Sequence, residues 1–310
     1  MERPFFSIVT PVSNGERYLE KTITSILNQS IKDYEYIIVD NRSSDNSKKI
    51  IEKYLSGITK FISEKDDGMY DALNKGFSNC NGKYFFWSAQ DDFRERTYVR
   101  KCVDLMEKNP KASLCNSNTA VFYKDPKNIM HINNLNSINN QKDIIKRYWN
   151  LSRNYNDVNI YGFMRSRFLK KTSLWLPING SANNLLFEMI ILGEFIQVSE
   201  LLFFYSGKSM YERPTPEQEY NRQSSTRKYF KYPFLILLYN QLKSIINKPI
   251  KFHTKILLIL IVLSDCSLVI LGKFIFRFLN IFFSENKIPK IIINFCLFLS
   301  YNNKDIKYIV

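Results

Sequence analysis

Apolar and polar positions alternate regularly along the first 120 residues of the chain. Four short apolar runs, at residues 5–12, 36–39, 59–63 and 84–89, have the composition of buried strands. A segment with apolar residues at helical spacing follows each of them, at residues 17–27, 48–55, 69–80 and 98–108. Apolar strands that alternate with helices are typical of a mostly parallel sheet with helices on both faces. The pattern therefore predicts an α/β fold.

The residues that follow these four strands are candidates for a ligand site. Ligands of parallel α/β sheets bind beyond the carboxyl ends of the strands. Polar side chains stand at all four ends, and three of the ends carry acids. In chain order the candidates are Pro11, Ser13 and Asn14, then Asp40, then the segment SEKDDGMYDALNKG at residues 63–76, and then Gln90, Asp91 and Asp92.

Carboxylates gathered at such an edge suit a hard divalent cation, which takes oxygen ligands and usually contacts a substrate phosphate. Each acid also has a simpler interpretation: Asp91 and Asp92 as a solvated turn, Asp40 as a turn acid, and Asp66 and Asp67 as caps of the next helix. Neither GxxxxGK[ST] nor GxGxxG occurs in this region, so a glycine-rich phosphate loop is disfavoured.

Composition narrows the class of protein further. The chain has two histidines and five scattered cysteines without a CxxC pair, which argues against a zinc site and a disulfide framework and favours a reducing compartment. The first residues show no pattern of a secretion signal. The net charge is +15, and residues 228–310 hold 12 Lys/Arg against 3 Asp/Glu, a local excess of +9. The basic character therefore belongs mainly to the tail.

Four blocks of the sequence together resemble glycosyltransferase family 2, whose members are inverting enzymes with the GT-A fold. The blocks are FSIVTPVSNGERYLEKTITSILNQS, YIIVDNRSSDNS, SEKDDGMYDALNKG and GKYFFWSAQDD, within residues 5–95. The third is similar to the form found in bacterial exopolysaccharide and lipopolysaccharide transferases. The resemblance implies a GT-A, Rossmann-like, mostly parallel sheet with helices on both faces, followed here by a helical C-terminal tail.

The resemblance also implies roles for individual residues. Pro11, Ser13 and Asp40 would line the nucleotide base and ribose, and Asp71 and Asn74 would border the nucleotide-sugar pocket. Gln90-Asp91-Asp92 occupies the DxD position, where Asp91 would lie near ribose or sugar and Asp92 would bind Mn²⁺ or Mg²⁺. Gln90 departs from the family, which has Asp at the first position of that motif.

An inverting mechanism needs a general base, which the family places at the start of a helix in the second half of the chain. The matching segment is residues 180–195, where Asn183 or Asn184 stands at the expected position of the Asp. Glu188 is the nearest acid, more than one helical turn further on. The candidate catalytic residues are therefore Glu188, Asn183 and Asn184, unless the base lies elsewhere.

The tail predicts a membrane-associated helix. Lys251, Lys255, Asp265, Lys273, Arg277 and Asn280 fall on one side of a helix whose remainder is apolar. Such a helix can lie on an anionic membrane face, pack on the catalytic domain, or span a bilayer, although its apolar run at residues 256–271 is shorter than the about 20 residues that spanning needs. We expect three parts: residues 1–120 for the nucleotide sugar, 121–230 for the acceptor, and 231–310 for the membrane.

The predicted function is transfer of one sugar from a nucleotide diphosphate sugar to a glycan acceptor, lipid-linked, in cell-surface polysaccharide synthesis at the cytoplasmic face of the membrane. The absence of a QxxRW motif favours single transfer over processive synthesis. A sugar-phosphate nucleotidylyltransferase is the alternative enzyme, but it would need a glycine-rich, Arg-containing loop after the first strand. A nucleic-acid-binding protein is disfavoured because the basic residues lie in an apolar tail.

Overall fold

The computed structural model describes residues 4–133, 141–154, 156–178, 180–207 and 233–264. The strands of this part join one mixed sheet in the order β3-β2-β1-β4-β8-β6-β9-β5, with β7 paired to β6. Their bounds are β1 Phe6–Val12, β2 Tyr34–Asp40, β3 Lys60–Ser63, β4 Tyr84–Trp87, β5 Phe93–Arg94, β6 Ala112–Tyr123, β7 Asp125–Asn133, β8 Phe163–Arg165 and β9 Glu194–Ser206.

The parallel part of the sheet is the one that the sequence predicted. Strands β1, β2, β3 and β4 run parallel, and β6 and β9 form a second parallel pair. Strand β8 joins the two groups because it pairs antiparallel with both β4 and β6. The boundary predicted at residue 120 falls inside β6, so the two predicted halves contribute strands to the same sheet.

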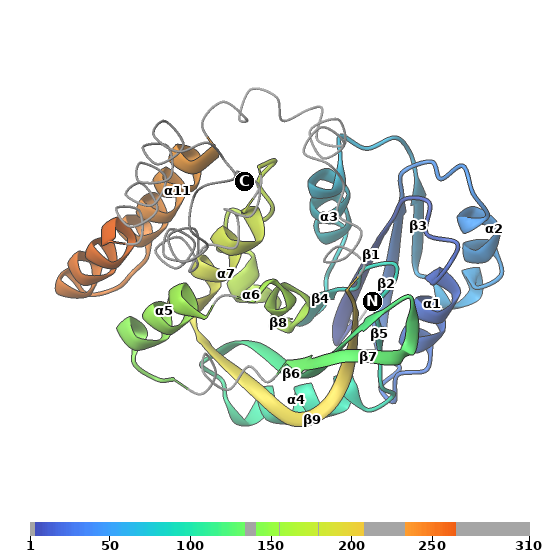
Figure 1. Cartoon of the computed structure of the whole chain (residues 1–310), viewed down its shortest axis with the longest axis horizontal. Coiled ribbons are helices and arrows are strands. Elements are labelled where there is room, and N and C mark those ends of the chain that lie inside the picture. Colours follow the sequence, from blue (N-terminus) through green and yellow to red (C-terminus); the bar gives the residue numbers. More distant parts are fainter. Residues whose placement is uncertain (1–3, 134–140, 155, 179, 208–232, 265–310) are drawn as a thin grey trace, which may run out of the picture.

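Helices cover both faces of the sheet, as Figure 1 shows. Alternate residues of β4 belong to different cores: Phe85 and Trp87 belong to the core that includes α3, α5 and α7, whereas Tyr84 and Phe86 belong to the core that includes α1, α2 and α4. This is the period of two expected of a strand buried on both faces. The helices are α1 Leu19–Leu27, α2 Ser47–Glu52, α3 Met69–Ser78, α4 Tyr98–Lys108, α5 Ile144–Arg153, α6 Ser166–Leu169 and α7 Ser181–Leu192, with short 3-10 turns η1 Leu55–Gly57 and η2 Asp157–Tyr161.

Two helices of the tail add buried residues to the core that includes α3, α5 and α7, among them Ile245, Leu258 and Val262. Helix α11, Pro233–Asn247, packs against α7 and is followed by a helix over residues 252–264 (Figure 1). In the described part of the chain, neither these nor any other helix combines the length and apolar character that crossing a membrane requires. Of the predicted basic stripe, Lys251 and Lys255 are described, while Asp265, Lys273, Arg277 and Asn280 lie outside the described residues.

Candidate functional site

The loops after β1 and β4 are clamped together at the carboxyl edge of the sheet. The Gln90 Oε1 accepts a hydrogen bond from the Ser13 N–H at 2.8 Å, and the Gln90 Nε2 donates to the Ser13 carbonyl at 3.2 Å. A Cβ atom added to Gly15 would stand 2.5 Å from the Gln90 Oε1, so the approach of the two loops depends on a glycine there. The side-chain amide of Gln90 therefore fixes the β1 loop beside the Asp91–Asp92 pair.

Asp40 holds a second junction at the same edge. It ends β2, is fully buried, and accepts hydrogen bonds from the Ser43 N–H at 3.2 Å and the Ser63 Oγ at 2.8 Å. The neighbouring loop is tied in as well, because the Asn14 N–H donates to the Ser43 Oγ at 2.9 Å. Asp40 thus joins the ends of β2 and β3 in this structure. Pro11, which was predicted to line the nucleotide together with Asp40, lies within β1 and is partly buried.

Positive φ angles occur in these loops, as they also do at Lys124 and Leu174 elsewhere in the described chain. Asn14 and Arg42 have φ angles of 50° and 45°, in the left-handed region that non-glycine residues rarely adopt. Gly68, which precedes α3, has a φ of 110°. Strained conformations of this kind gather at ligand-binding sites, where the surrounding structure holds them in place.

The carboxylates of Asp66 and Asp71 accept hydrogen bonds from nearby backbone N–H groups, and Asp71 also pairs with Lys75. The Asp66 carboxylate accepts from the Gly68 N–H at 2.9 Å, and burial raises the pKa of Asp66 above its ordinary value. The Asp71 Oδ2 accepts from the Asp67 N–H at 3.2 Å and lies 3.3 Å from the Lys75 Nζ. Of the acids predicted here, Asp71 stands in the first turn of α3, at the edge where the sequence placed it.

Asn74, predicted to border the nucleotide-sugar pocket, forms two hydrogen bonds with Trp175. The Asn74 Nδ2 donates to the Trp175 carbonyl at 2.8 Å, and the Trp175 N–H donates to the Asn74 Oδ1 at 3.1 Å. Both polar ends of this amide are therefore engaged with the backbone of one residue in the loop before α7. Asn74 thus holds that loop, while one N–H of its Nδ2 and one lone pair of its Oδ1 stay available for a further partner.

The two acids at the DxD position differ sharply in exposure. Asp92 is fully buried, while Asp91 is partly exposed. The Asp92 Oδ1 accepts from the Ser206 N–H at 2.8 Å, but the buried Oδ2 has no hydrogen-bond partner. Burial raises the pKa of Asp92 well above its ordinary value, and the neighbouring Asp91 adds to the rise, whereas the Ser206 N–H and Arg94 oppose it.

The unpaired Asp92 oxygen fits a divalent cation. A buried carboxylate oxygen without a donor is costly, and a hard cation takes such oxygens as ligands. Within the described part of the chain, no three His, Cys, Asp or Glu side chains gather where they could hold a metal ion. The donor set therefore consists of one carboxylate pair, and further ligands would have to come from a bound phosphate or water.

Two of the candidate catalytic residues of α7, Glu188 and Asn184, are buried and hydrogen-bonded to each other. The Glu188 carboxylate accepts from the Ser173 N–H at 2.8 Å, the Ser173 Oγ at 2.8 Å and the Asn184 Nδ2 at 3.1 Å. Lys248 lies 3.7 Å from the Glu188 Oε2. These contacts occupy the carboxylate, so the geometry argues against Glu188 as the general base. Asn183 lies in the first turn of α7, partly buried, and its Oδ1 has no partner.

Two residues of this region carry no motif that would have revealed them. The Arg94 guanidinium is buried and donates to the Ser88 Oγ at 2.9 Å and the Tyr161 carbonyl at 2.9 Å. Trp175 packs its ring against Trp87 with centroids 5.5 Å apart. The one hint in the sequence is that Arg94 stands two positions after the acid pair. Trp175 gives no such hint, because about a hundred residues separate it from the residues that it contacts.

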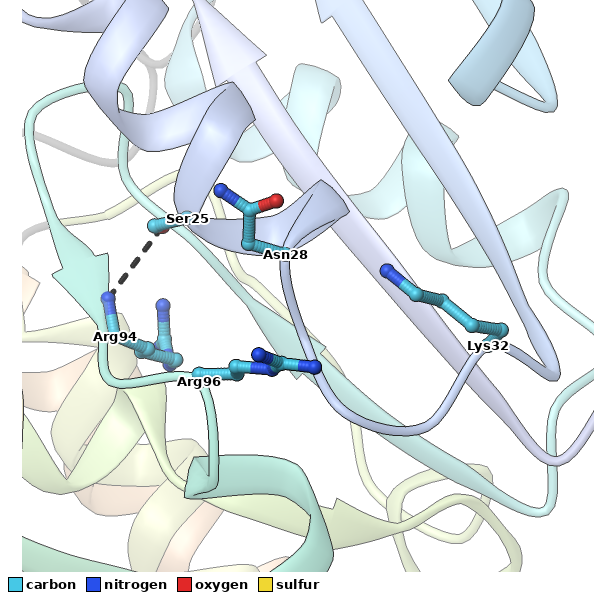
Figure 2. Close-up of a pocket in the computed structure, with 5 residues that line it drawn as sticks. All are labelled: Ser25, Asn28, Lys32, Arg94 and Arg96. Atoms are coloured by element: carbon cyan, nitrogen blue, oxygen red, sulfur yellow. Dashed lines mark hydrogen bonds between the residues drawn. The ribbon is translucent and has the colours of Figure 1, made fainter.

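A cavity of about 530 Å³ lies away from this edge (Figure 2). It opens beside Asn28, the C-cap of α1, whereas the Ser13–Gln90 clamp stands before the start of that helix. The Arg94 N–H donates to the Ser25 Oγ at 3.4 Å in its wall. Because it lies at the opposite end of α1, the cavity does not coincide with the site predicted from the strand ends. Its lining residues are Ser25, Asn28, Lys32, Arg94 and Arg96.

The chain is similar in sequence to known glycosyltransferases. A family model described as Glycosyl transferase family 2 matches residues 7–170 of the 310. An uncharacterized glycosyltransferase of Rickettsia conorii is 32% identical over 146 residues, which cover 42% of this chain and 23% of that protein. Chondroitin synthase of Escherichia coli is 33% identical over 108 residues, 34% of this chain and 16% of that protein. The matched region thus spans less than a quarter of either relative.

Solved structures share the fold at low sequence identity. TarS of S. aureus, residues 1–349 in complex with UDP, has a TM-score of 0.60 at 13% identity and covers 84% of this chain and 71% of that chain. The same protein in complex with UDP-GlcNAc has a TM-score of 0.60 at 14% identity, with the same coverage. At such identities the likeness concerns the fold alone.

Proposed function

The chain belongs to glycosyl transferase family 2 and has the GT-A fold, and from this premise we propose that it transfers a single sugar from a nucleotide diphosphate sugar to a glycan acceptor. The proposal rests on the arrangement of residues at the carboxyl edge of the parallel strands. There the Ser13–Gln90 clamp and the Asp40 junction hold two strained loops beside the Asp91–Asp92 pair. A nucleotidylyltransferase would need a glycine-rich, Arg-containing loop after β1, and the loop here is Ser13-Asn14-Gly15-Glu16.

The nucleotide is proposed to lie over Pro11, Ser13 and the Asp40 junction. Asp40 is buried, so its part is to fix the loop that contacts base and ribose. Asp71 and Asp91 stand nearer the protein surface at the same edge and are proposed to contact ribose or sugar hydroxyls. Carboxylate oxygens accept hydrogen bonds from such hydroxyls and so orient the ring.

Asp92 is proposed to hold Mn²⁺ or Mg²⁺ through its unpaired Oδ2, with Asp91 as the adjacent carboxylate. When bound, the ion supplies charge stabilisation to the leaving diphosphate. The Ser206 N–H fixes the Asp92 carboxylate from the other side at 2.8 Å. Asp92 therefore connects the donor edge to the end of β9, a strand of the predicted acceptor part.

On the acceptor side, Glu188 is proposed to hold α7 in place and not to accept the proton of the acceptor hydroxyl. It ties α7 to Ser173 and to Lys248, which follows α11. A neutral amide is not a base at physiological pH, so the Asn183 Oδ1 can accept a hydrogen bond from an acceptor hydroxyl but cannot remove its proton. The first turn of α7 is then an orienting element for the acceptor.

The tail helices are proposed to rest on an anionic membrane surface at the cytoplasmic face, where a lipid-linked acceptor for cell-surface polysaccharide synthesis would be presented. Exposed apolar side chains form a continuous stripe on the helix over residues 252–264, and Lys251 and Lys255 flank it. Apolar burial combined with basic flanks is typical of helices that bind membrane interfaces. The exposed side chains are Phe252, Ile256, Leu257, Leu260 and Leu263.

Thermal melts with a panel of nucleoside diphosphates and their sugars test the donor proposal. We expect one nucleotide series to raise the melting temperature of the full chain, and we expect Mn²⁺ or Mg²⁺ to enlarge the rise, because a ligand that binds the folded state stabilises it. The Ser13→Ala variant keeps the clamp, since the Ser13 contacts to Gln90 are made by its backbone, so a smaller rise in this variant would report a contact of the Ser13 hydroxyl with the nucleotide. No stabilisation by any nucleotide, with or without metal, would contradict the proposal.

A further inference from the structure

Trp175 carries a buried hydrogen-bond donor that has no acceptor. The residue lies in the loop between α6 and α7, is 6% exposed, and its Nε1 has no hydrogen-bond partner. The indole N–H can only donate. Most buried donors in folded proteins are paired, and one that is not calls for a specific explanation such as a missing ligand.

Residues of α3 and β4 hold both the backbone and the ring of Trp175. Asn74 forms two hydrogen bonds with the Trp175 backbone, at 2.8 and 3.1 Å. The Trp87 ring meets it edge to face, with centroids 5.5 Å apart and an interplanar angle of 79°. The Tyr70 ring lies 6.0 Å away. The unpaired N–H is therefore held in place and does not belong to a loosely packed side chain.

The residues that hold the indole belong to the donor half of the site. Trp87 is the last residue of β4 and stands four positions before Asp91. Tyr70 is in the first turn of α3, directly before Asp71. Trp175 is thus a residue of the acceptor half whose ring packs on the strand and helix that carry the proposed sugar-contacting acids.

We propose that the Trp175 indole N–H donates a hydrogen bond to a hydroxyl oxygen of the donor sugar, and that Asn74 positions it. Sugar hydroxyls accept hydrogen bonds, and the apolar C–H face of a pyranose packs against aromatic rings. The inference rests on the proposed function and adds a specificity residue that lies outside the four sequence blocks of the donor half. It also gives Asn74 a role, because its two hydrogen bonds hold the Trp175 backbone in place.

Trp175→Phe is the direct test, because it removes the N–H and keeps an aromatic ring. The substitution removes an unpaired buried donor but also shrinks a buried side chain, so the melting temperature of the unliganded variant is measured alongside. Calorimetry then compares the dissociation constants of a nucleoside diphosphate and of its sugar, such as UDP and UDP-GlcNAc. We expect the affinity gained from the sugar to fall by roughly 2- to 10-fold in the variant, with the diphosphate affinity unchanged.

Two further variants separate positioning from packing. Trp87→Phe is the matched control, since the Trp87 Nε1 already donates to the Leu73 carbonyl at 3.4 Å, and it should lower the melting temperature without altering the sugar contribution. Asn74→Ala should reduce the sugar contribution while the diphosphate affinity stays the same. A purely structural role would lower the melting temperature without changing the ratio of the two dissociation constants.

The outcomes distinguish this inference from the proposed function. If the wild-type chain binds no nucleotide sugar, the proposed function fails and the inference fails with it. If wild type binds nucleotide sugar and Trp175→Phe retains the full sugar contribution, the role of Trp175 is refuted and the donor site stands.

Discussion

Replacing Glu188 by Gln separates a structural role of this carboxylate from a catalytic one. Glu188 is 4% exposed and accepts hydrogen bonds from the Ser173 N–H, the Ser173 Oγ and the Asn184 Nδ2. A Gln side chain keeps one acceptor oxygen and places an NH₂ group where the second oxygen stood. Either the Ser173 N–H or the Asn184 Nδ2 then faces the NH₂ group of the Gln, which is also a donor. Lys248 no longer has a carboxylate as its partner.

The size of the effect follows from these contacts. A buried donor left without an acceptor costs about 1–3 kcal/mol, and removing one member of a buried ion pair costs about 3–5 kcal/mol. Lys248 keeps a backbone acceptor, the Lys171 carbonyl, and its side chain is 13% exposed, so the lower end of the second range applies. Together, about 3 kcal/mol for the ion pair and about 1–3 kcal/mol for the unpaired donor lead us to expect that Glu188→Gln lowers the free energy of unfolding by about 4–6 kcal/mol.

Urea unfolding followed by tryptophan fluorescence measures this loss, and release of nucleoside diphosphate per folded molecule measures turnover. Glu200→Gln is the surface control, since the Glu200 side chain is 56% exposed and its pairing with Lys101 should contribute less than about 1 kcal/mol. We expect the folded Glu188 variant to lose less than about tenfold in turnover. Wild-type stability combined with a loss of about 10²-fold or more, the scale of general-base catalysis, would refute this reasoning and make Glu188 the base.

Three other predictions concern the edge and the tail. Gly15→Ala should displace the Gln90 side chain, because the new Cβ would stand 2.5 Å from its Oε1, and calorimetry should show a roughly tenfold weaker affinity for nucleoside diphosphate; an unchanged affinity would contradict the clamp. The raised pKa of Asp92 means that its contribution to stability is complete below the unfolded pKa of about 3.9 and is lost as the pH rises through the folded pKa. As the pH rises from about 4 to neutrality, the free energy of unfolding of metal-free Asp92→Asn, measured by chemical denaturation, should therefore fall less than that of metal-free wild type. Identical pH profiles of the two proteins would refute the raised pKa of Asp92. Leu260→Asp should release the chain from anionic vesicles in a flotation assay, whereas 0.5 M salt alone should leave much of it bound, since apolar burial is insensitive to salt; full retention of the variant would contradict the membrane surface.

The parallel half of the fold could be predicted from the sequence because its strands are buried on both faces. A strand such as β4 is apolar at every position and is followed by polar residues, so its limits are visible without tertiary information. The predicted strand at 84–89 nevertheless extended two residues too far, since β4 ends at Trp87 and the chain then turns toward Gln90. Strand β5, only two residues long, has no periodicity that a sequence could show.

The order of strands predicts that Asp40 and Asp92 follow β2 and β4, but it does not predict the surroundings of their side chains. Both carboxylates are buried, and each accepts a hydrogen bond from a serine of another strand, Ser63 or Ser206. Glu188 stood out in the sequence as the nearest acid on its helix. Its engagement with Ser173 depends on a loop whose path no local pattern specifies.

The central claim is that the carboxyl edge binds a nucleoside diphosphate together with a divalent cation at the acid pair. Calorimetric titration of the preferred nucleoside diphosphate, with and without Mn²⁺, tests it in wild type, Asp92→Asn and Asp91→Asn. We predict that Mn²⁺ tightens binding to wild type by about tenfold or more and that Asp92→Asn loses this increment while it still binds the nucleotide weakly, because an amide is a poor ligand for a hard cation. Wild-type metal dependence in both variants, or no nucleotide binding by wild type under either condition, would contradict the claim.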